Sequence, residues 1–129
     1  MPQIILTPQE SEEFFYNAIC NGLGYVTTGY GLELDYDRSQ YKQAKASLID
    51  KSPCFEDVFM EMLRMGFSLT LEDVEGDGDN TKSITMKDVH EWVSKTPFTH
   101  LSDMIMENDD AETADIIIQT VFFNDVIFG

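Results

Sequence analysis

Residues 67–85, FSLTLEDVEGDGDNTKSIT, decide the fold class of this chain. Residues 67–74 show the period-two pattern of a half-buried strand. One face would carry Phe67, Leu69, Leu71 and Asp73, and the other face Ser68, Thr70, Glu72 and Val74. Residues 75–80 then combine Gly, Asp and Asn, a composition typical of turns. A second short run, residues 81–85, follows the turn. We therefore predict a β-hairpin over 67–85 with a long acidic loop.

A second alternating stretch lies upstream, at residues 30–36. It reads YGLELDY, in which tyrosine or leucine alternates with Gly, Glu and Asp. This pattern also predicts a half-buried strand. Together with the hairpin it indicates a small antiparallel sheet.

Helix signals fill the remainder of the chain. Residues 7–10, TPQE, predict the start of a first helix, because they form a capping box with proline at the first helical position. Gly22 and Gly24 predict that this helix ends near Asn21. Five further helices are expected, beginning at Asp37, Cys54, Thr85, Thr96 and at Asp109 or Asp110. The pattern predicts an α+β fold in which about six helices pack on the sheet, as one domain over residues 1–129.

The composition is strongly acidic. The 129 residues include 24 Asp and Glu against 8 Lys and Arg, a formal net charge of −16. Because 43% of the residues are hydrophobic, the charge does not indicate a disordered acidic tail. It disfavours direct binding to nucleic acid or to an anionic membrane, since both require clustered basic residues. Residues 1–37 and 97–129 contain no Lys or Arg, so we expect acidic faces there.

Several sequence features favour a cytoplasmic protein. The N-terminal residues lack the basic and apolar regions of a secretory signal, and no apolar run approaches the length of a membrane helix. Cys20 and Cys54 form no CxxC motif; we expect buried free thiols, with a disulfide bridge as the alternative.

The acidic residues suggest a protein-binding surface. Glu33 and Asp35, with Asp37 just beyond, are two apart on a predicted strand, about 6.6 Å, which is close to two phosphate rises of about 3.4 Å along a DNA strand. They either imitate phosphates toward a basic partner or form the solvated side of an edge strand. The full set of candidate partner-binding residues is Glu33, Asp35, Asp37, Glu72, Glu75, Asp77, Asp79, Asp103, Glu107, Asp109, Asp110 and Glu112.

The acidic loop also invites comparison with a calcium site. Asp73, Asp77, Asp79 and Asp88 supply hard oxygen ligands of the kind that Ca²⁺ and Mg²⁺ bind. The order of residues does not match an EF-hand, so the alternatives are weak Ca²⁺ or Mg²⁺ binding and a plain hairpin turn. No other cofactor is expected.

We find no complete catalytic motif in the sequence. His90 begins an HExxH-like stretch, but Ser94 stands where the second metal-binding histidine belongs. Neither a P-loop nor a GxSxG nucleophile motif occurs. The apolar residues 116–128 form either a core element or a site that docks a partner.

Three stretches resemble small uncharacterised proteins of bacteriophages and mobile elements: residues 31–36, GLELDY; residues 68–73, SLTLED; and the closing residues 113–129. The resemblance implies an accessory role and carries no catalytic residue. We therefore expect a non-enzymatic protein, such as an inhibitor, that binds a basic nucleic-acid-binding host protein. The alternatives are a divalent-cation module centred on residues 73–88 and an assembly component that uses the apolar C-terminal segment.

Overall fold

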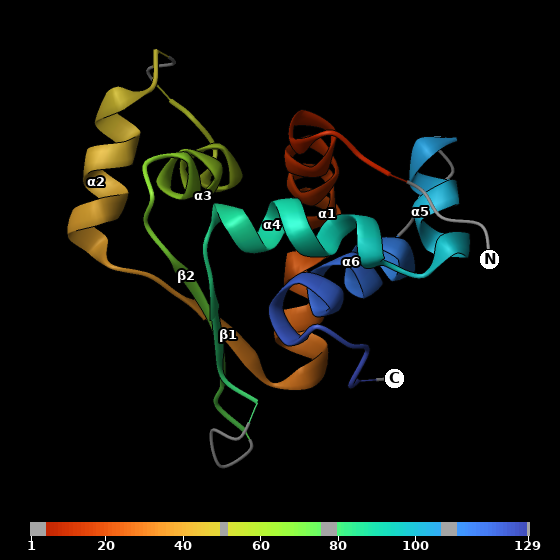
Figure 1. Cartoon of the computed structure of the whole chain (residues 1–129). Coiled ribbons are helices and arrows are strands. Elements are labelled where there is room, and N and C mark those ends of the chain that lie inside the picture. Colours follow the sequence, from red (N-terminus) through yellow and green to blue (C-terminus); the bar gives the residue numbers. More distant parts are fainter. Residues whose placement is uncertain (1–4, 50–51, 76–79, 107–110, 129) are drawn as a thin grey trace.

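The computed structural model describes residues 5–49, 52–75, 80–106 and 111–128 (Figure 1). Within them the chain forms helices around a three-stranded antiparallel sheet, so the predicted α+β fold is confirmed. In chain order the elements are α1 (Pro8–Tyr30), β1 (Leu32–Asp35), α2 (Arg38–Ser47), α3 (Phe55–Arg64), β2 (Leu69–Asp73), β3 (Lys82–Ile84), α4 (Met86–Trp92), a 3-10 turn (Val93–Lys95), α5 (Phe98–Ile105) and α6 (Ala111–Phe123).

The sheet has the strand order β1-β2-β3. The predicted hairpin is present, since β2 and β3 pair antiparallel with Leu69 opposite Ile84. β1 pairs with the other edge of β2, with Leu34 opposite Leu71. Leu69, Leu71 and Ile84 are buried, so one face of the sheet belongs to the core.

The first helix is longer than predicted. α1 continues through Gly22 and Gly24 and ends at Tyr30, where Gly31 adopts a left-handed conformation with φ 68°. Gly22 is needed for packing, because a Cβ there would lie 2.6 Å from the Cβ of Ala114 on α6. The prediction of an end near Asn21 is wrong because this glycine permits a close helix–helix approach and does not terminate the helix.

The capping predictions are confirmed. Thr7 and Glu10 form a reciprocal capping box at the start of α1. The side chain of Asp37 accepts a hydrogen bond from the Gln40 N–H at 3.0 Å and caps α2. Thr85 is the N-cap of α4, and its N–H donates to Asp88 Oδ2 at 2.8 Å. These caps satisfy helix N–H groups that lack partners within the helix.

The apolar C-terminal helix lies in the core. Ile117, Ile118 and Val121 of α6 are buried, and α6 packs along α1 (Figure 1). Beyond α6 the chain folds back, and Phe128 stacks on Tyr30 with ring centroids 4.8 Å apart. This segment therefore serves mainly as a core element.

Gln119 fixes the returning C-terminal segment. Its side chain is fully buried and its Nε2 donates to Asp115 Oδ1 at 2.7 Å and to the Phe128 carbonyl at 3.1 Å. Its Oε1 accepts from the N–H groups of Ile127 and Phe128, each at 2.8 Å. Asp115 in turn accepts from the Tyr30 hydroxyl at 2.5 Å, and burial together with this bond raises the pKa of Tyr30. The amide thus links α1, α6 and the end of the described chain.

The expected burial of the cysteines is wrong. Cys20 and Cys54 are both exposed free thiols, Cys20 on the solvent side of α1 and Cys54 at the N-cap of α3. Burial raises the pKa of Cys20, since part of its side chain still contacts the protein. Among the described helices, none combines the length and the apolar character needed to cross a bilayer.

Candidate protein-interaction surface

Two glutamates face each other on neighbouring strands. The register places Glu33 of β1 opposite Glu72 of β2, and both side chains are exposed. The Val74 N–H donates to the Gly31 carbonyl at 3.1 Å, and hydrogen-bonded pairs recur at every second residue of an antiparallel ladder. Glu33 and Glu72 are therefore a hydrogen-bonded pair, and opposed residues of this kind have Cβ atoms about 5 Å apart.

Asp35 extends this acidic surface by one step along β1. It lies two residues beyond Glu33 and opposite Thr70, whose hydroxyl is 2.7 Å from that of Ser83 on β3. We call Glu33, Asp35, Thr70, Glu72 and Ser83 the acidic sheet face. It carries three carboxylates and two hydroxyls.

The basic residue of the hairpin does not compensate these charges. Lys82 of β3 pairs with Leu71, which is buried on the core side of the sheet. Side chains of successive residues point to opposite faces of a sheet, so Lys82 lies on the same face as Leu71 and not on the face that carries Glu72. The three carboxylates thus share one face of the sheet without a cation from its strands.

The other predicted partner-binding residues that the structure describes do not gather on this face. Asp37 caps α2, and the Glu75 side chain lies against Gly31. Asp103 belongs to α5, which Figure 1 places on the opposite side of the molecule from the sheet. Glu112 lies in the first turn of α6. Five more of the predicted residues lie outside the described part of the chain: Asp77, Asp79, Glu107, Asp109 and Asp110.

The proposed metal ligands are not brought together where the structure describes them. Asp73 is buried in β2, and its N–H donates to Thr81 Oγ1 at 3.0 Å. Asp88 is engaged in the capping box of α4. Asp77 and Asp79 lie outside the described residues. Among the described residues, no group of three or more His, Cys, Asp or Glu side chains is arranged to hold a metal ion.

A groove of about 660 Å³ adjoins the acidic sheet face. Its walls come from α1, from β1 and from the start of α3, and it includes Glu33. Sequence reasoning missed this groove. The sequence feature that could have indicated the groove is the spacing of Gly24, Thr27 and Thr28, which places three small residues on one side of a helix.

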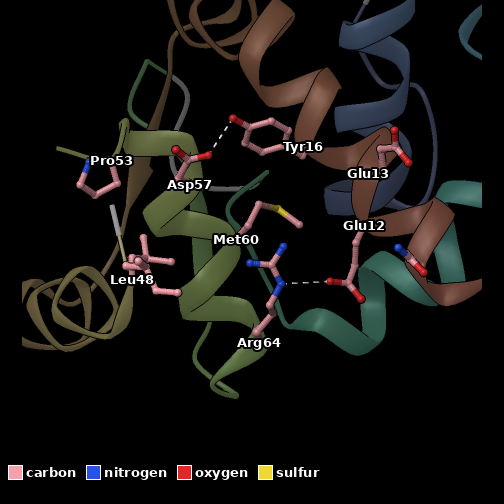
Figure 2. A pocket seen from close by; sticks show the side chains of 10 residues that line it. Glu12, Glu13, Tyr16, Leu48, Pro53, Asp57, Met60 and Arg64 are labelled. Atoms are coloured by element: carbon pink, nitrogen blue, oxygen red, sulfur yellow. Dashed lines mark hydrogen bonds and ion pairs between the residues drawn. The ribbon is translucent and has the colours of Figure 1, made fainter. Parts of the chain in front are cut away.

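A second cavity, of about 470 Å³, lies between α1 and α3 (Figure 2). Tyr16 of α1 donates a hydrogen bond to Asp57 Oδ1 of α3 at 2.7 Å. This bond lowers the pKa of Asp57 and, with the nearby Cys54 thiol, raises the pKa of Tyr16. The pair therefore joins the two helices at one end of the cavity.

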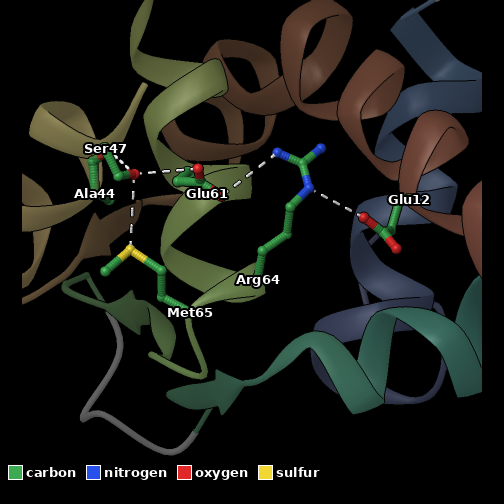
Figure 3. A network of polar contacts seen from close by, with 6 residues as sticks. All are labelled: Glu12, Ala44, Ser47, Glu61, Arg64 and Met65. Atoms are coloured by element: carbon green, nitrogen blue, oxygen red, sulfur yellow. Dashed lines mark hydrogen bonds and ion pairs between the residues drawn. The ribbon is translucent and has the colours of Figure 1, made fainter. Parts of the chain in front are cut away.

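Glu12 joins the same helices at the other end. Its Oε1 accepts from Arg64 Nε at 3.2 Å, and its Oε2 lies 3.1 Å from His90 Nε2 of α4. Figure 3 shows that Arg64 also contacts Glu61, which accepts a hydrogen bond from the Ser47 hydroxyl of α2. Because both oxygens of Glu12 are engaged, this network fits a structural role in holding four helices together.

Comparisons of the chain with protein-family models, with curated proteins and with solved structures found no match. We therefore infer the function from the geometry of the acidic sheet face and of the groove beside it.

Proposed function

We propose that this chain is a non-enzymatic interaction protein whose acidic sheet face binds the basic, nucleic-acid-binding surface of another protein. The observation that carries the proposal is the exposed pair Glu33–Glu72, directly opposed across two strands, with Asp35 one step further along. Like charges in this position destabilise a sheet. A cation from a partner removes that repulsion, so the same carboxylates that weaken the free protein strengthen a complex.

The spacing and the net charge support the same proposal. Glu33 and Asp35 lie on one face of a strand at about 6.6 Å, near the distance of two phosphate steps. The net charge of −16 also steers a basic protein toward this chain over distances of about a Debye length. In its specific form, the proposal is an inhibitor that occupies the nucleic-acid site of a basic cytoplasmic host protein, as an accessory protein of phage type does.

Affinity capture with matched variants tests the proposal. The wild-type chain, the variant Glu33→Gln/Glu72→Gln and the control Glu13→Gln/Glu91→Gln are immobilised and exposed to a low-salt lysate of the cells that produce the protein. Both variants remove two exposed carboxylates, so they have equal net charge.

We expect one or more basic proteins to bind the wild type and the control, to elute as salt rises, and to bind the sheet-face variant weakly. The captured protein should also lose bound nucleic acid when the wild-type chain is added. Equal capture by all three baits, or capture that salt does not weaken, would contradict the proposal.

A further inference from the structure

β1 is an edge strand with one side unpaired in the described sheet. It pairs with β2, and the strand order β1-β2-β3 leaves its other side free. In an antiparallel ladder, residues between hydrogen-bonded pairs turn their N–H and C=O groups away from the neighbouring strand. Since Glu33 faces Glu72 in a hydrogen-bonded pair, the backbone groups of Leu32 and Leu34 point toward this free edge. Of the two residues, Leu34 is partly exposed and Leu32 is buried.

The groove of about 660 Å³ runs along the same edge. Leu32, Glu33 and Leu34 all line it, and because successive side chains point to opposite faces, a groove that meets all three follows the edge of the strand. α1 forms the other wall. Phe55, which is 65% exposed, and the buried Phe59 contribute apolar surface from α3.

The wall formed by α1 combines the apolar residues Ile19 and Leu23 with the small residues Gly24, Thr27 and Thr28. Gly24 is exposed in the middle of a helix, and a Cβ added there would meet no atom within 4 Å. A helical glycine is less stable than alanine by about 1 kcal/mol, and Gly24 does not recover this energy through packing as Gly22 does. The missing side chain leaves room beside Thr27 and Thr28.

The charge in the groove has one sign. Among the described residues that line it, Glu33 and Glu56 are the charged ones, and Asp35 lies two residues beyond Glu33 on β1. This charge disfavours a second copy of the chain, since pairing two β1 edges would bring their acidic residues together. It favours an extended segment in which basic and apolar residues alternate.

We infer that the groove between α1 and β1 binds an extended basic segment of a partner protein by strand addition. The segment pairs its backbone with the N–H and C=O groups of Leu34, which is partly exposed, whereas Leu32 is buried. Its apolar side chains enter the groove toward Phe55, and its basic side chains reach Glu33 and Glu56. The inference rests on the proposed function, because it identifies the part of the basic partner that the acidic surface receives.

A short capped peptide of alternating lysine and valine serves as the probe. Its affinity is compared with that of the same peptide N-methylated at every second residue, which keeps the charge but blocks one hydrogen-bonding edge. We expect N-methylation to weaken binding by about tenfold or more, because it removes backbone hydrogen bonds. On binding of the unmethylated peptide, amide exchange should slow at Leu34.

Two protein variants provide a matched test. Gly24→Met places a side chain in the groove, whereas Gly29→Met places the same side chain on open surface of the same helix, outside the groove. Both should fold, since neither added Cβ meets another atom within 4 Å. We expect Gly24→Met to abolish peptide binding and Gly29→Met to leave it unchanged.

The outcomes separate this inference from the proposed function. Equal affinity for both peptides, with salt-dependent binding that Glu33→Gln/Glu72→Gln weakens, would overturn strand addition and leave the acidic sheet face as the binding surface. Binding of the unmethylated peptide as a helix would also overturn it. Concentration-dependent pairing of this chain with itself that excludes the peptide would assign the edge to a second copy and contradict the inference.

Discussion

Neutralising one member of the Glu33–Glu72 pair should stabilise the free protein. Two unit charges about 6 Å apart in water repel by about 0.7 kcal/mol, and measured cross-strand pairs contribute roughly 0.2–1 kcal/mol. We therefore expect Glu72→Gln to raise the free energy of unfolding by about 0.5 kcal/mol. Because surface substitutions without such a partner have small effects of either sign, the gain must be compared with a control of equal charge.

Urea denaturation measures this gain. With a slope of about 2 kcal/mol per M, the midpoint should rise by roughly 0.25 M. Glu91→Gln changes the net charge equally but removes an ion pair, since Glu91 Oε1 lies 3.7 Å from Lys95 Nζ. It should leave the midpoint unchanged or lower it slightly.

Two further measurements identify the source of the effect. At about 1 M salt the Debye length falls to about 3 Å, so the gain from Glu72→Gln should disappear. In a double-mutant cycle, adding Glu33→Gln to Glu72→Gln should give much less than the sum of the single gains, because the repulsion has already been removed. Additive gains, or a gain that persists at high salt, would refute the reasoning about this pair.

Other predictions concern the core and the contacts between helices. Gln119→Leu should destabilise the protein by about 2–4 kcal/mol in urea denaturation, since it removes four hydrogen bonds of a fully buried amide, one of them to the buried Asp115. A loss below about 1 kcal/mol would contradict the role of this amide. Gly22→Ala should destabilise the protein by about 1 kcal/mol, because crowding against Ala114 costs more than the gain in helix propensity returns. A rise in the thermal midpoint would contradict this prediction. The pKa of Asp57 is lowered in the folded protein by Tyr16, so the stability from this contact is present above the ordinary pKa of 3.8 and is lost as pH falls. Tyr16→Phe should therefore make the free energy of unfolding less dependent on pH in the acid range. Urea midpoints near neutral pH and at about pH 3 measure this dependence. If it is the same in the variant as in the wild type, the assignment of this contact is contradicted.

Local sequence patterns predicted most of the fold. The alternation in residues 67–74 gave the hairpin arm, and the capping signals of Thr7, Asp37 and Thr85 gave the starts of three helices. The end of α1 was not predictable in this way. A glycine ends a helix in one context and admits a neighbouring helix in another, and the difference for Gly22 depends on Ala114, far away in the sequence.

The candidate site was predictable only in part. The spacing of Glu33 and Asp35 along one strand placed them on a common face, and both are exposed. That Glu72 stands opposite Glu33 depends on the register between two strands separated by two helices, which neither strand specifies alone. The groove beside β1 requires α1 to turn back at Gly31, so it could not be found while that helix was predicted to end near Asn21.

Carbodiimide cross-linking tests most directly whether the acidic sheet face is the binding surface. This reagent joins a carboxylate to a lysine amine that touches it, so mass spectrometry of the captured complex identifies the acidic residues in contact. We predict cross-links from Glu33, Asp35 or Glu72 to lysines of the partner's nucleic-acid-binding surface. Cross-links confined to Asp103, Glu112 or other carboxylates away from the sheet would contradict the account.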